Sequence, residues 1–230
     1  DAFNAADQIE FSGGKKNTIN FEFIKGRLKA RYNASSPQTA SRYFEKLYID
    51  IPSHENKYAY IIALKANGQT LQALNLIDEI LTKFPKNLIL NITKSEILLS
   101  GQQLARAEQS IEKVLTISPG NYPASIIQSK ILSAKKEIIK AEEVLRDLLI
   151  KKNRDPSLWM QLSEVQRAGK NIVGYHLSRG EYYLLIGDFE NALNQFQFAL
   201  RLSGNSFQAS ETIITKIKFA QERLGNKRGF

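Results

Sequence analysis

Apolar residues return at a fixed interval along this chain. In the segment 71–87, a small residue, two large apolar residues and a proline follow one another at Ala73, Ile77, Ile80 and Pro85. A spacing of four and then three residues places such side chains on one face of a helix, and a proline cannot continue the helix, so it closes the unit. The same order recurs twice downstream at equal spacing and once upstream at nearly the same spacing, at Ala107, Ile111, Val114 and Pro119, at Ala141, Leu145 and Leu148, and at Ala40, Phe44, Leu47 and Pro52.

A period of about 34 residues with small, large apolar and proline positions in this order is typical of the tetratricopeptide helical hairpin. A single hairpin cannot cover its own apolar face, so neighbouring hairpins must stack. The sequence therefore predicts an all-α fold, a tetratricopeptide-repeat α-solenoid of about eleven helices in stacked antiparallel pairs. The residues expected to pack between these helices are Ala40, Phe44, Ala73, Ile77, Ala107, Ile111, Ala141, Leu145, Trp159, Gly180, Tyr183, Ala192 and Phe196.

The order of units along the chain follows from the same pattern. Residues 1–18 are polar and without periodicity around Ser12 to Asn17, and they predict a linker or the tail of an upstream domain. The segment from Gly180 to Ala199 matches a complete repeat better than any other in the chain. The predicted solenoid covers 19–224, with units at about 21–53, 54–87, 88–121 and 122–155, an extra helix at 156–172, a further unit at 173–206 and a capping helix at 207–224, followed by a frayed tail at 225–230.

Composition narrows the classes of partner. The net charge of +9 is compatible with an acidic partner, a nucleic acid or an anionic membrane surface. Lysines are scattered over the predicted helix faces without a dense basic cluster, which favours a solvated basic surface over a nucleic-acid site. The absence of cysteine excludes disulfides, thiol catalysis and cysteine zinc sites. No apolar run approaches the ~20 residues that span a bilayer, and the first residues lack a signal-peptide pattern.

Candidate chemistry is sparse. His54 and Glu55 open like the HExxH motif, in which two histidines four residues apart hold zinc, but Tyr58 stands at the place of the second histidine. His176 has no second histidine near it in sequence, and no glycine-rich phosphate loop occurs. We therefore expect no catalytic residue, no metal site and no cofactor in this chain.

Surface binding is then the remaining function. In a tetratricopeptide stack the first helices line a groove, and an apolar floor with mixed charges suits an extended or helical peptide. The alternative is that Ile62, Ile89 and Ile92 are simply core residues. The charged clamp of chaperone-tail binders is disfavoured because Tyr58, Ile62 and Thr93 cannot supply it. The predicted groove residues are Glu22, Lys25, Tyr58, Ile62, Lys65, Ile89, Ile92 and Glu96.

Two segments carry a more specific resemblance. NFEFIKGRLKARY and LWMQLSEVQRAGKNIVGYHLSRGEYYLLIGDFENALNQFQFAL resemble the C-terminal tetratricopeptide region of periplasmic HExxH zinc metalloproteases of the beta-barrel assembly-enhancing protease type. In that family a catalytic domain precedes a helical array with a similar opening helix and a similar closing run. The matching positions are Trp159, His176, Arg179, Glu181, Tyr182, Gly187 and Ala192.

The resemblance implies that the protease domain and its zinc lie outside this chain. It further implies a periplasmic location, and as partners the chain's own upstream protease domain and outer-membrane proteins or their assembly machinery, with neither nucleic acid nor a membrane span involved. A stand-alone adaptor or secretion chaperone with no enzymatic domain is the alternative.

Overall fold

The computed structural model describes residues 18–32, 36–204 and 207–227, and in this part of the chain all regular structure is α-helical. The all-α prediction is confirmed, with twelve helices in the described residues where about eleven were expected. In chain order they are α2 (Thr18–Tyr32), α3 (Pro37–Asp50), α4 (His54–Ala66), α5 (Thr70–Lys83), α6 (Leu88–Ser100), α7 (Leu104–Ile117), α8 (Tyr122–Ala134), α9 (Ile138–Lys151), α10 (Pro156–Ala168), α11 (Ile172–Leu185), α12 (Phe189–Leu202) and α13 (Phe207–Lys227).

Polar caps start every second helix at the repeat interval. The side chains of Ser53, Asn87, Asn121 and Asp155 each accept a hydrogen bond from a backbone N–H in the first turn of α4, α6, α8 and α10. The four caps occupy the same position in successive repeats. Because such a bond satisfies a donor that the first turn of a helix leaves unpaired, each cap fixes where a hairpin begins.

The turn inside each hairpin also recurs at the repeat interval. Residues 68, 102, 136 and 170 have positive φ, and the last three are Gln102 at 58°, Lys136 at 69° and Lys170 at 59°. Only the first, Gly68, is a glycine, the residue that adopts this conformation without strain. The hairpin geometry is therefore imposed on three non-glycine residues by the packing of the flanking helices.

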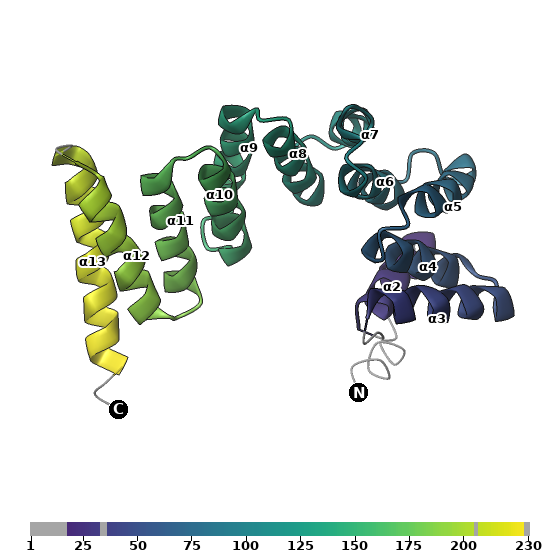
Figure 1. The fold of residues 1–230 in the computed structure, drawn as a ribbon, viewed down its shortest axis with the longest axis horizontal. Helices are drawn as coiled ribbons and strands as arrows, with labels where there is room; N and C mark the ends of the chain where they lie inside the picture. Colours follow the sequence, from purple (N-terminus) through teal and green to yellow (C-terminus); the bar gives the residue numbers. More distant parts are fainter. Residues whose placement is uncertain (1–17, 33–35, 205–206, 228–230) are drawn as a thin grey trace. The chain divides into compact units, whose positions relative to one another are not determined.

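The chain divides between Phe84 and Pro85 into two compact units, which we call unit 1 and unit 2. In unit 1, α2 and α3 both pack against α4, and α4 packs against α5. In unit 2, consecutive helices from α6 to α13 pack on one another, and Figure 1 shows α11, α12 and α13 side by side in green to yellow. None of the described helices has the length and apolar character needed to cross a membrane.

The core of each unit lies where the repeat pattern places it. The alanines and the large apolar residues expected at helix contacts are buried: Ala40, Phe44, Ala73, Ile77, Ala107, Ile111, Ala141, Leu145, Ala192 and Phe196. Gly180 is buried too, and a Cβ atom added to it would lie 2.2 Å from the Phe196 ring. Trp159 and Tyr183 pack against the core from partly buried positions.

Candidate functional site

In unit 1, one of the predicted groove residues is a core residue. Tyr58 is fully buried, with its ring centroid 5.1 Å from that of Phe23. Its hydroxyl accepts a hydrogen bond of 3.1 Å from Arg27. The expectation that Tyr58 lines an open groove is therefore wrong, because α2 lies across this face of α4.

Two further groove candidates, Glu22 and Lys25, hold α2 to the start of α4. Glu22 Oε2 lies 3.6 Å from His54 Nδ1, and Lys25 Nζ lies 3.8 Å from Glu55 Oε2. Lys29 forms a second ion pair with Glu55. The pair His54–Glu55, which opens like a zinc-protease motif, thus serves as the docking point of a helix.

All but one of the remaining groove candidates are partly exposed to solvent. Ile62 and Lys65 are half-buried on α4 in unit 1. In unit 2, Ile89 and Glu96 are half-buried on α6, whereas Ile92 is only 7% exposed and belongs to the core. The core alternative thus holds for Ile92, and a binding role for the others stays a prediction.

A polar pocket of about 420 Å³ lies in unit 1 between α3, α4 and the turn that follows α4. Tyr60 donates a 2.8 Å hydrogen bond to Glu45 and accepts one of 2.8 Å from Gln72. Burial and the hydrogen bond to Glu45 raise the pKa of Tyr60 to about 12. Asn67 donates to Ser41 across the pocket. The wall is almost wholly polar, unlike the mostly apolar walls of typical small-molecule sites.

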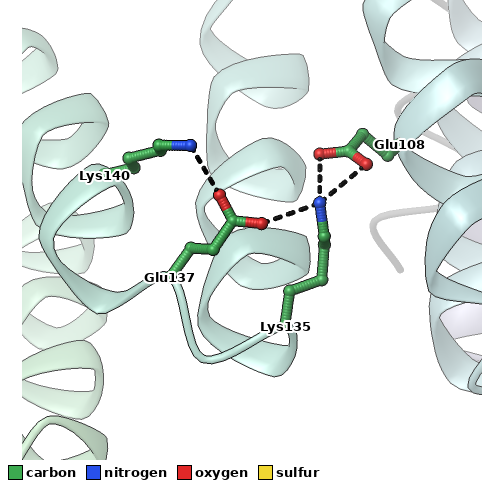
Figure 2. Close-up of polar contacts among 4 residues, drawn as sticks. All are labelled: Glu108, Lys135, Glu137 and Lys140. Atoms are coloured by element: carbon green, nitrogen blue, oxygen red, sulfur yellow. Dashed lines mark hydrogen bonds and ion pairs between the residues drawn. The ribbon is translucent and has the colours of Figure 1, made fainter.

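An ion-pair network joins two neighbouring hairpins of unit 2, α6–α7 and α8–α9 (Figure 2). Lys135, at the end of α8, reaches back to Glu108 of α7 at 2.8 and 2.9 Å and sideways to Glu137 at 2.7 Å. Lys140 pairs with the other oxygen of Glu137 at 2.8 Å. Hydrogen bonds donated by Lys135 and Lys140 lower the pKa of Glu137 to about 2. The bonds that Lys135 donates to Glu108 and Glu137 in turn raise the pKa of Lys135.

Aromatic and arginine side chains line up across α11 and α12 in unit 2. Arg179 lies over the rings of Tyr175 and Tyr183, and Arg201 lies over Phe198. His176 lies between Tyr175 and Phe198, with ring centroids 5.0 and 5.2 Å away. The sequence resemblance singles out His176 and Arg179, but it does not reveal Phe198, which belongs to another helix. We call this set the Arg–aromatic row: Tyr183, Arg179, Tyr175, His176, Phe198 and Arg201.

Within the described residues, no group of three or more histidine, cysteine, aspartate or glutamate side chains is placed to hold a metal ion. His54 faces Glu22 and two aromatic rings, and His176 faces Gln195 and Phe198. The donor sets around both histidines therefore do not fit a zinc site.

Comparison with solved structures identifies the fold. A tetratricopeptide repeat protein from Parabacteroides merdae aligns with 96% of this chain and 90% of its own, with a TM-score of 0.53 and 17% identity. The fold is that of a tetratricopeptide repeat protein. TTC0263, a thermophilic tetratricopeptide protein of Thermus thermophilus, covers 86% of this chain and 98% of its own, with a TM-score of 0.52 and 17% identity.

A MamA RS-1 double mutant covers 75% of this chain and 96% of its own, with a TM-score of 0.51 and 16% identity. At such identities the likeness concerns the tetratricopeptide fold alone. No family model matches the sequence. No curated protein matches it either.

Proposed function

We propose that this chain is a polypeptide-binding tetratricopeptide module, and specifically the partner-recognition region of a periplasmic zinc metalloprotease that serves outer-membrane protein assembly and quality control. The observation that carries the binding role is the stack of helical hairpins, matched over 96% of the chain by a tetratricopeptide protein. A stack of this kind offers long surfaces for extended or helical segments of other proteins. The protease assignment rests on the resemblance of the opening helix and of the run from Leu158 to Leu200.

In this proposal the chain selects and holds the substrate, while zinc chemistry belongs to a separate domain. Ile62 and Lys65 stand one helical turn apart on α4, where both keep part of their surface. An apolar group beside an ammonium group suits an unfolded outer-membrane segment, in which apolar and polar side chains alternate. On α6 of unit 2, Ile89 and Glu96 also keep part of their surface, but they stand two helical turns apart and the charge is negative.

The test joins this chain to an HExxH protease domain and follows cleavage of an unfolded outer-membrane polypeptide. We expect the fusion to cleave that polypeptide faster than the protease domain alone, and Ile62→Glu to reduce the gain. The isolated chain should bind no stoichiometric zinc and leave casein uncut. Equal cleavage with and without the repeats contradicts the protease assignment. Capture of the polypeptide by the isolated chain, with no gain in the fusion, favours a stand-alone adaptor.

A further inference from the structure

The Arg–aromatic row begins on α11 with a guanidinium held between two rings. The Arg179 guanidinium carbon lies 5.2 Å from the ring centroid of Tyr183 and 5.7 Å from that of Tyr175. Arg179 Nη2 also donates a 2.6 Å hydrogen bond to the Tyr183 hydroxyl. The three residues stand four positions apart along one face of the helix, so the arrangement is fixed by helical geometry.

The row continues onto α12 through stacked rings. His176 and Phe198 stack at 5.2 Å with 21° between their planes. The His176 Nδ1 atom lies 2.8 Å from Gln195 Oε1, at hydrogen-bond distance, which fixes the imidazole between its neighbours. At the far end the Arg201 guanidinium carbon lies 4.5 Å from the Phe198 centroid. The row therefore spans two helices of unit 2 as one ordered surface.

The two arginines of the row contact other groups than Arg146 and Arg167 of unit 2 do. Arg146 pairs with Glu142 and Arg167 with Glu164. Within the described residues, Arg179 and Arg201 make no ion pair with a carboxylate and lie on aromatic rings instead. A guanidinium that stacks on a ring by its face keeps N–H donors at its edge for a further acceptor.

Exposed apolar surface lies beside these cations. Phe198 is 43% exposed and Leu202, one turn further along α12, is 51% exposed. A partner that contacts this surface buries two apolar side chains and meets two positive charges on the row. Its complement is a segment in which carboxylates alternate with aromatic or aliphatic side chains, and the net charge of +9 favours its approach.

We propose that the Arg–aromatic row binds an acidic polypeptide segment, with carboxylates on the edges of Arg179 and Arg201 and an apolar side chain against Phe198. This inference rests on the proposed polypeptide-binding function and names one surface for it. A nucleic acid fits less well, because single strands stack their bases on open ring faces. In the row, arginines or neighbouring rings already lie against Tyr175, Tyr183 and His176.

The test measures fluorescence anisotropy of a short labelled peptide of alternating glutamate and phenylalanine, mixed with the full chain. We expect saturable binding that Arg201→Gln weakens roughly tenfold, because a charge-assisted hydrogen bond is lost. Arg223→Gln is the matched control, since Arg223 lies over the exposed ring of Phe219 at 5.1 Å on α13, outside the row. The control should bind as the parent does. Arg201 is exposed, so its replacement leaves the fold intact.

Two comparison ligands complete the experiment. A peptide with glutamine in place of glutamate should bind at least tenfold more weakly, since the charge-assisted bonds are gone. Equal affinity of the two peptides, equal affinity of Arg201→Gln and the parent, or tighter binding of a single-stranded oligoribonucleotide overturns the inference. If the chain binds unfolded outer-membrane polypeptide but not the acidic peptide, only the inference about the Arg–aromatic row is wrong. If it binds neither, the proposed polypeptide-binding function is wrong as well.

Discussion

The α2–α4 contact of unit 1 and the α6–α7 and α8–α9 contacts of unit 2 are held by different chemistry. In unit 1, α2 docks on α4 through Gly26 and through the pairing of Lys25 and Lys29 with Glu55. In unit 2, the pairs α6–α7 and α8–α9 close through buried serine hydroxyls, which donate from Ser95 to the Ala107 carbonyl and from Ser129 to that of Ala141. The strength of an ion pair between helices depends on the salt concentration and on the charge of both partners. The strength of a neutral hydrogen bond from a serine hydroxyl does not. Salt should therefore loosen the α2–α4 contact and leave the α6–α7 and α8–α9 contacts unchanged.

The largest expected effect comes from Gly26→Ala. A Cβ atom at this position would lie 2.5 Å from the Glu55 carbonyl oxygen, which is backbone and cannot turn aside. We expect a loss of about 1–3 kcal/mol in the free energy of unfolding, as overpacking typically costs. Urea unfolding measures it, and Gly225→Ala is the control, because a Cβ atom added there would meet no neighbouring atom within 4 Å. Equal midpoints for the two variants contradict the close approach.

A pair of variants distinguishes the ion-paired helix contact of unit 1 from the hydrogen-bonded helix contact of unit 2. Glu55→Gln removes the carboxylate that pairs with Lys29 and should cost about 1–2 kcal/mol. Ser95→Ala removes one neutral hydrogen bond and should cost about 1 kcal/mol. Urea unfolding at about 0.1 M and about 1 M NaCl distinguishes them, because the Debye length falls from ~10 to ~3 Å. The Glu55 penalty should shrink in salt and the Ser95 penalty should not. If the two penalties change equally with salt, the proposed difference between the α2–α4 and α6–α7 contacts is wrong.

The network around Lys135 predicts a pH dependence within unit 2. The pKa of Glu137 is lowered from 4.5 to about 2 by Lys135 and Lys140. A lowered folded-state pKa contributes stability above the unfolded pKa and loses it as the pH falls. The Tm should therefore decrease between about pH 4.5 and about pH 2, and Glu137→Gln should flatten that part of the profile. An unchanged slope in the variant contradicts the role of the network.

The smallest expected effect is a gain in the free energy of unfolding. Lys136 has a φ of 69° in the turn between α8 and α9, whereas Gly68 occupies the matching position in unit 1. Lys136→Gly relieves the left-handed strain of a side-chain-bearing residue, partly offset by the entropy of glycine in the unfolded chain. We expect stabilisation by about 0.5–1 kcal/mol in urea unfolding. Gly68→Lys should destabilise unit 1 by a similar amount, and a loss of stability in Lys136→Gly argues against strain at this turn.

The repeat pattern predicted much of the fold because local packing repeats with the sequence. Ala73 and Ala107 occupy equivalent contacts in successive repeats, and both are buried. The serine hydroxyl bonds could have been found in the same way, since Ser95 and Ser129 also share one position in successive repeats. The groove residues are harder to predict from the sequence. Tyr58 is core because Gly26 lets α2 lie across α4, and such a long-range contact leaves no periodic signal.

The site on α11 and α12 shows the same limit. His176 and Arg179 can be singled out by resemblance, but the row also needs Phe198 and Arg201 from the next helix. Which residues of two neighbouring helices face each other depends on their relative rotation. That rotation follows from side-chain packing, here Gly180 against Phe196, rather than from the sequence of either helix alone.

The measurement that tests the central claim most directly is equilibrium binding of an unfolded outer-membrane β-barrel polypeptide to the intact chain. Photo-crosslinkers placed at positions 62 and 202, both with side-chain surface available, report which unit holds the polypeptide. The account predicts saturable binding, with crosslinks at one or both positions that unlabelled polypeptide competes away. Absence of saturable binding, or crosslinks that competitor leaves unchanged, would contradict a polypeptide-recognition role for this chain.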